Sequence, residues 1–77
     1  MNIKIDTEIE IDGKNMYVIE KESYKEKEYI FVQEVGEDDL LPNYFIYEIG
    51  NPFKLIKDDT LYLILLRKFT EKLQSEL

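Results

Sequence analysis

Carboxylates are the side chains of this sequence that could do chemistry. The densest groups are Glu37-Asp38-Asp39 and Asp58-Asp59, and neighbouring acids of this kind can supply oxygen ligands to calcium or magnesium. The first group lacks the alternating spacing and the trailing Glu of a calcium-binding loop. We favour a solvated loop for residues 37–39 and a helix N-terminus for the second group. Among three hypotheses for the function, metal binding or catalysis through Glu37, Asp38 and Asp39 ranks third. It predicts that calcium or magnesium would raise the melting temperature of the protein.

The sequence offers little other chemistry. It contains no His, Cys or Trp, which removes Cys–His and Ser–His nucleophile pairs and the usual ligands of zinc and haem. Gly13, Gly36 and Gly50 stand singly, so the sequence has no glycine-rich phosphate loop. A chain of 77 residues is also too short to wall in a cleft between two catalytic carboxylates. We therefore expect no enzyme, with no catalytic, cofactor or metal site.

The net charge narrows the class of partner. Seventeen acidic and ten basic residues give a formal charge of −7, which disfavours direct contact with nucleic acid phosphates. Acidic residues also flank the aromatic segments 29–31 and 44–47, where a base-stacking sheet would need cations. The charge would suit a basic partner, and it also serves simply to keep a small domain soluble.

The sequence also indicates where the protein resides. Its N-terminal residues include acids and no long apolar block, so we expect no signal peptide. The longest apolar run, Leu61–Leu66, is far shorter than the roughly 18–20 residues that a membrane span requires. The lack of cysteine fits a reducing compartment. We expect a soluble, cytoplasmic protein that does not bind membranes.

Apolar periodicity predicts the strands. Isoleucines alternate with charged residues over 3–11, which indicates a half-buried strand, and Asp12-Gly13 is typical of a type I′ turn into a second strand over 14–21. The polar stretch 21–28 makes a second reversal. A third strand over 28–35 carries apolar residues on both faces.

The rest of the chain predicts a loop, one or two strands and a helix. Residues 36–43 form a loop because Pro42 cannot donate to a strand ladder. A fourth strand follows over 44–49 and a short fifth over 53–56. Acids and Thr60 mark the start of a helix over 59–75, along which Tyr62, Leu66, Phe69 and Leu73 form one stripe. Leu61–Leu66 is apolar all round and is compatible with a strand by itself, but the cap and the stripe favour the helix.

These elements predict an α+β fold, in which an antiparallel meander of four to five strands carries one C-terminal helix packed on one face, in a single domain over 1–77. The expected core residues are Ile9, Ile11, Val18, Tyr29, Phe31, Ile46, Leu55, Ile56, Leu65, Leu66 and Phe69. One helix covers only one face of a sheet. Either the helix is sandwiched, another chain covers the remaining apolar surface, or the tyrosines lie with their hydroxyls in water.

The order of features resembles the YrzB-like domains of unknown function, small acidic proteins of low-GC Gram-positive bacteria. The matching segments are "SYKEKEYIFV", "GEDD", "YFIYEI" and "KLIKDDTLYLI". The helix here is far more apolar than the acidic helix of such proteins. The resemblance implies a fold of a hairpin, an acidic loop, a Tyr-containing strand and a C-terminal helix, and it lends no active site.

Two functional hypotheses rank above metal binding or catalysis by residues 37–39. The first is a non-enzymatic protein–protein interaction module, self-association included, because apolar surface exceeds what one face needs. Tyr44, Tyr47 and Tyr62 are then the expected anchors, since interface hot spots favour aromatic side chains. The alternative is a small acidic inhibitor of the phage anti-defence or nucleic-acid-mimic type, which occupies a basic groove of a nucleic-acid-handling protein through residues 37–39.

Overall fold

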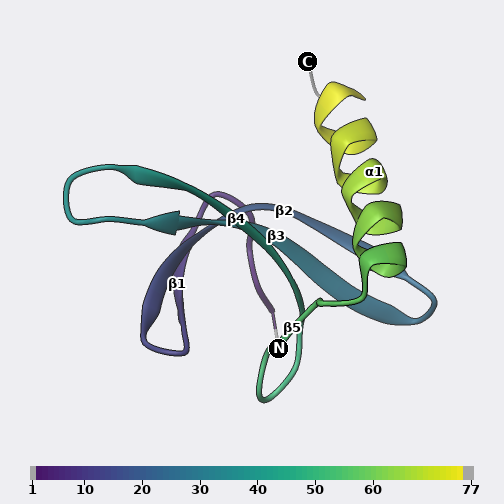
Figure 1. Ribbon diagram of the computed structural model, residues 1–77, viewed down its shortest axis with the longest axis horizontal. Coiled ribbons are helices and arrows are strands. Elements are labelled where there is room, and N and C mark those ends of the chain that lie inside the picture. Colours follow the sequence, from purple (N-terminus) through teal and green to yellow (C-terminus); the bar gives the residue numbers. More distant parts are fainter. Residues whose placement is uncertain (1, 76–77) are drawn as a thin grey trace.

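The computed structural model describes residues 2–75. Within that range the elements are β1 (Glu8–Ile11), β2 (Lys14–Tyr24), β3 (Lys27–Val35), β4 (Leu40–Glu48), β5 (Lys54–Leu55) and α1 (Asp59–Ser75). The antiparallel strands follow one another across the sheet in chain order, and the sheet curls into a half-barrel with α1 against one face (Figure 1). The predicted α+β meander with one C-terminal helix is confirmed. Within residues 2–75, α1 falls short of the length and apolarity that a membrane-crossing helix needs.

Two tight turns build the first two hairpins. Asp12 and Gly13 both have positive φ, 52° and 80°, as the predicted type I′ turn between β1 and β2 requires. The second turn is tighter than predicted, because β2 and β3 are joined by Lys25 and Glu26 alone, with φ of 50° and 67°. Its lack of glycine concealed it in the sequence. Two consecutive non-glycine residues in the left-handed region carry backbone strain.

Replacing this strained turn should stabilise the fold. The double substitution Lys25→Asn/Glu26→Gly supplies the residue types that a two-residue hairpin turn favours. We expect a gain of about 1 kcal/mol in the free energy of unfolding, after the extra flexibility of Gly in the unfolded chain is discounted. Urea unfolding followed by circular dichroism measures it. The same double substitution at Lys54 and Lys57 has no such strain to relieve, and a gain there of equal size would contradict the explanation.

The first strand is shorter than predicted, since β1 begins at Glu8 and not at residue 3. Asp6 has a φ of 61°, and the Thr7 hydroxyl donates a hydrogen bond of 2.6 Å to the carbonyl of Lys4. The chain therefore turns before it joins the sheet. The backbone N–H of Asp6 then donates to the carbonyl of Val18, at 2.8 Å, which holds this turn against β2.

The fourth strand is longer than predicted. It begins at Leu40 and includes Pro42, so the loop expected over 36–43 shrinks to four residues. β5 pairs only with the C-terminal end of β4, and the pairing of β4 with β3 shifts register between Gln33 and Val35. The prediction failed because a proline is tolerated in a strand where an edge or an irregularity leaves its missing N–H without a partner.

The sheet carries a hydrophobic cluster on each face. The sheet cluster comprises Ile11, Met16, Val18, Ile30, Val32 and Tyr47. The helix cluster, beneath α1, comprises Tyr29, Ile46, Leu65 and Phe69. Ile3 and Phe53, which lie outside the strands, pack against the sheet cluster. The second face of the sheet is thus covered by the curl of the sheet and by its own connecting segments, and it requires no second chain.

Most of the predicted core is confirmed. Six of the expected residues are buried, namely Ile11, Val18, Tyr29, Ile46, Leu65 and Phe69. Four others are half-buried against the clusters, namely Ile9, Phe31, Ile56 and Leu66. Leu55 was wrongly predicted, because it lies in a two-residue edge strand and is 37% exposed. The prediction missed Met16, Ile30, Val32 and Tyr47, which belong to the face that the helix does not cover.

Among residues 2–75, one buried residue is charged. A bulge between Val18 and Glu20 shifts β2 by one residue, so that Glu20 pairs with Phe31 and lies on the helix side of the sheet. Glu20 is only 2% exposed. The ammonium of Lys72 in α1 lies 3.7 Å from its Oε1 and donates a 2.6 Å hydrogen bond to the carbonyl of Lys21. Among the described residues, Glu20 Oε2 has no hydrogen-bond partner. Lys72 therefore fastens the end of α1 to β2.

Removing the positive charge of Lys72 should destabilise the protein. Lys72→Met leaves the Glu20 carboxylate buried without its counter-charge, which costs about 3–5 kcal/mol for a fully buried pair. We expect about 2 kcal/mol here, because the side chain of Lys72 is 40% exposed and water can reach the pair. Urea unfolding measures the loss, and the double variant Glu20→Met/Lys72→Met should regain most of it. Equal stabilities for Lys72→Met and the wild type would refute this role of Lys72.

Candidate functional site

The three tyrosines expected as anchors do not share a surface. Tyr44 is 48% exposed, and its ring stacks on Phe31 with 5.8 Å between centroids. Tyr47 is a core residue instead of an exposed anchor, because it pairs with Ile30 and its ring enters the sheet cluster. Tyr62 is half-buried against the helix cluster. Of the three, Tyr44 presents the most surface to a partner.

The acidic loop after β3 is a compact turn. The N–H of Gly36 donates to the carbonyl of Asp39 at 2.7 Å, and Asp39 Oδ1 accepts the N–H of Leu40 at 2.8 Å. Glu37 and Asp38 are exposed beside it. In residues 2–75, no three acidic side chains are grouped so that they could hold a metal ion. The loop therefore presents carboxylates to solvent.

Acidic residues from two hairpins gather at one end of the sheet, which we call the acidic end and define as residues 8–16 and 33–44. Strand pairing joins the two segments, since Met16 lies opposite Glu34. The β1–β2 turn and the β3–β4 loop lie at the end of the sheet away from α1 (Figure 1). The acidic end has one lysine, Lys14, and seven carboxylates: Glu8, Glu10, Asp12, Glu34, Glu37, Asp38 and Asp39. The other described residues, 2–7, 17–32 and 45–75, carry nine acidic and nine basic side chains, so the charge is strongly asymmetric.

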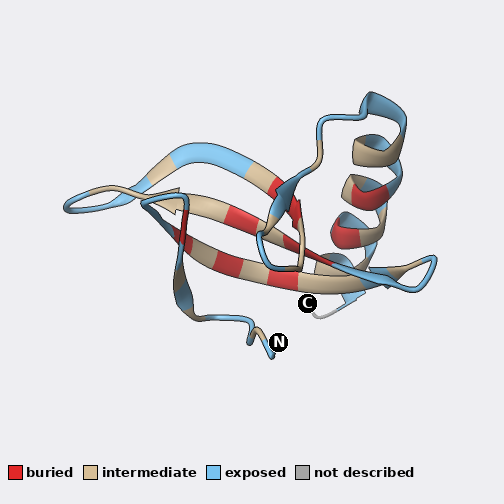
Figure 2. Ribbon diagram, turned by 90° about the horizontal axis from the view of Figure 1, so that it is seen from below, coloured by how far each residue is buried: buried red, intermediate tan, exposed pale blue. Residues whose placement is uncertain are grey.

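At the other end of the molecule, α1 exposes apolar side chains. Asp58 caps this helix, since its Oδ1 accepts the N–H of Leu61 at 3.0 Å. The buried residues of α1 face the sheet, and its other side is exposed (Figure 2). On that side Leu63 is 64% exposed and Ile64 is 36% exposed. This apolar surface of α1 remains exposed although both faces of the sheet are covered.

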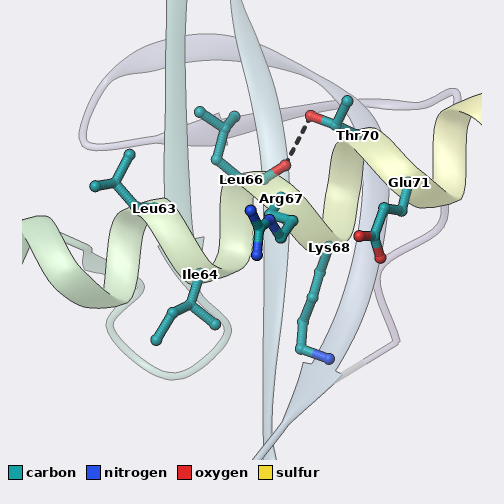
Figure 3. A pocket seen from close by; sticks show the side chains of 7 residues that line it. All are labelled: Leu63, Ile64, Leu66, Arg67, Lys68, Thr70 and Glu71. Atoms are coloured by element: carbon teal, nitrogen blue, oxygen red, sulfur yellow. Dashed lines mark hydrogen bonds between the residues drawn. The ribbon is translucent and has the colours of Figure 1, made fainter.

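A shallow depression of about 740 Å³ runs along this side of α1. It is lined by Leu63, Ile64, Leu66, Arg67, Lys68, Thr70 and Glu71, which we call the outward face of α1 (Figure 3). The Thr70 hydroxyl is turned back along the helix, where it donates to the carbonyl of Leu66 at 2.8 Å. Since every lining residue belongs to one helix, the depression has a single wall. Such a surface can complement another macromolecule but cannot enclose a small ligand.

Leu63, Ile64 and Arg67 were not predicted as site residues from the sequence. A signal was present in the all-round apolar run 61–66, because a helix that packs on one sheet buries only one stripe. Residue 63 lies about 100° around the helix from Tyr62, and thus outside the predicted stripe.

The chain matches no protein-family model, no curated protein and no solved structure. The resemblance to YrzB-like domains stays a prediction. Two surfaces of the molecule, the acidic end and the outward face of α1, bear on its function.

Three tyrosines are held in the neutral form. The Asp6 carboxylate accepts a 2.5 Å hydrogen bond from the Tyr17 hydroxyl and raises the pKa of Tyr17 above its ordinary value of 10.0. Burial raises the pKa of Tyr29 and of Tyr47, and nearby carboxylates add to the effect. Each raised pKa means that the folded state favours the neutral hydroxyl.

The fold should therefore lose stability at alkaline pH. The contribution of these tyrosines to the free energy of unfolding is fully present below pH 10.0. It is lost as the pH rises through their raised pKa values in the folded state. Tyrosinate absorbance should show Tyr17, Tyr29 and Tyr47 ionising late, together with unfolding. Asp6→Asn should lower the pKa of Tyr17 alone, whereas Asp38→Asn, the control, should change nothing. Ionisation of Tyr17, Tyr29 and Tyr47 near pH 10 in the folded protein would contradict this assignment.

Proposed function

We propose that this chain is a non-enzymatic protein–protein interaction module that binds its partner through the outward face of α1. The exposure of Leu63 carries the proposal, since the opposite side of the same helix is already packed on the sheet. Ile64 adjoins it, and the charged residues Arg67, Lys68 and Glu71 line the same depression. An apolar centre with a polar rim is the usual anatomy of a protein contact.

The size of the apolar centre indicates a modest affinity. Burial of a fully exposed Leu or Ile side chain contributes about 1.5–3 kcal/mol, and Leu63 and Ile64 would each contribute less because both are already partly buried. Association itself costs roughly 4–15 kcal/mol in lost freedom of motion. Contacts of the neighbouring polar side chains must therefore add to the binding free energy. A small, reversible interface is the expected form.

The test is capture of partners from a native lysate by the tagged protein, compared between the wild type and Leu63→Glu. Leu63 has few contacts to lose, so this variant should fold, which circular dichroism checks. We expect a partner that survives a high-salt wash and is lost with Leu63→Glu, while the control Leu40→Glu, also on an exposed leucine, retains it. Equal capture by the two variants would remove the outward face of α1 from the proposal.

The second candidate is an acidic inhibitor that occupies a basic groove of a nucleic-acid-handling protein. The gathering of seven carboxylates against one lysine at the acidic end favours it over an even scatter of charge. Such a field would speed encounter with a basic surface and would be screened by salt.

Neutralising the acidic loop separates this candidate from the first. The triple variant Glu37→Gln/Asp38→Asn/Asp39→Asn should lose a basic partner that the wild type captures at low salt and releases at high salt. The matched control Glu22→Gln/Glu26→Gln/Glu28→Gln removes the same charge outside the acidic end and should retain it. If both triple variants behaved alike, the acidic end would have no specific part in binding.

A further inference from the structure

We infer that the outward face of α1 docks on the same face of a second copy of this chain, with the two helices antiparallel. The inference rests on the proposed function and names its partner. It is carried by Asp59, Leu63 and Arg67, which follow one another at intervals of four residues and so lie along one stripe of the helix. This charged stripe reads acid, apolar, base.

The order of the charged stripe is complementary to itself. In an antiparallel pair with its two-fold axis at Leu63, a residue four positions before the axis faces the residue four positions after it in the other copy. Asp59 of each copy then faces Arg67 of the other, and Leu63 faces its equivalent. Each charge lies about 6 Å along the helix from the axis. Two ion pairs thus flank an apolar contact in an isologous interface.

The side chains of the stripe are available for this contact. Asp59, Leu63 and Arg67 are all exposed, and Arg67 projects from the middle of the outward face (Figure 3). The helix cap is made by Asp58 and does not use Asp59. In the part of the chain that the structure describes, neither Asp59 nor Arg67 forms an ion pair.

The distribution of charge favours a second copy over a basic partner at this face. The charge of −7 would repel two copies if it were spread evenly. Outside the acidic end, however, the described residues are balanced at nine acids and nine bases. The hairpin turns of the acidic end lie across the sheet from α1, so contact through α1 keeps the two acidic ends apart (Figure 1). A basic partner would be drawn to the acidic end instead.

A charge-swap experiment tests the pairing. Sedimentation velocity over a range of concentrations should show a monomer–dimer equilibrium for the wild type. Arg67→Glu and Asp59→Arg should each raise the dimer dissociation constant at least about tenfold, because each places like charges opposite one another. The double variant Asp59→Arg/Arg67→Glu should restore the dimer, since both pairs are then reversed. Lys14→Glu and Asp38→Arg change the net charge equally at the acidic end and should leave the equilibrium unchanged.

Three outcomes would overturn the inference. A monomer at every concentration would exclude the second copy, and the proposed function would then stand or fall separately on Leu63-dependent capture of another protein. A dimer that neither single variant weakens, or that the double variant fails to restore, would show that the charged stripe is not its interface.

Discussion

Four consecutive apolar residues in β3, Tyr29–Val32, send side chains alternately to the two faces of the sheet, and the architecture follows from the need to cover both. Tyr29 lies beneath α1, while Ile30 and Val32 lie on the opposite face. A small domain cannot leave either set in water, since burial of apolar area is its main source of stability. The helix therefore covers one face, and the sheet curls over the other.

The bulge in β2 changes the face of the sheet on which the later side chains of this strand lie. Before the bulge, Val18 contributes to the sheet cluster, and after it Glu20 lies on the helix side opposite Phe31. The extra residue also increases local twist and so assists the curl of the sheet. Its consequence is a buried carboxylate, which Lys72 compensates from α1. The same bulge thus affects both the curvature of the sheet and the packing of α1 on it.

Once both faces are covered, the remaining surface divides by charge. The hairpin turns away from α1 carry most of the uncompensated negative charge, whereas the helix end is balanced and exposes Leu63. A charged end keeps a small protein dispersed and attracts basic surfaces, and a neutral end with exposed apolar groups is suited to contact. The two proposed modes of binding therefore use opposite ends of one domain and need not compete.

The sequence by itself determined the order of the elements, the Asp12-Gly13 turn and the helix capped by Asp58, because alternation, turn chemistry and capping are local properties. It did not reveal the Lys25-Glu26 turn or Pro42 within β4, since in both cases strand pairing overrides the local preference. The structure placed the candidate anchor Tyr47 in the core, and it placed Leu63, which was not a candidate, on the surface. Aromatic and aliphatic residues look equally apolar in a sequence. Only the curl of the sheet and the rotation of α1 about its axis decide which of them meet solvent, because both depend on contacts between residues that are distant in the chain.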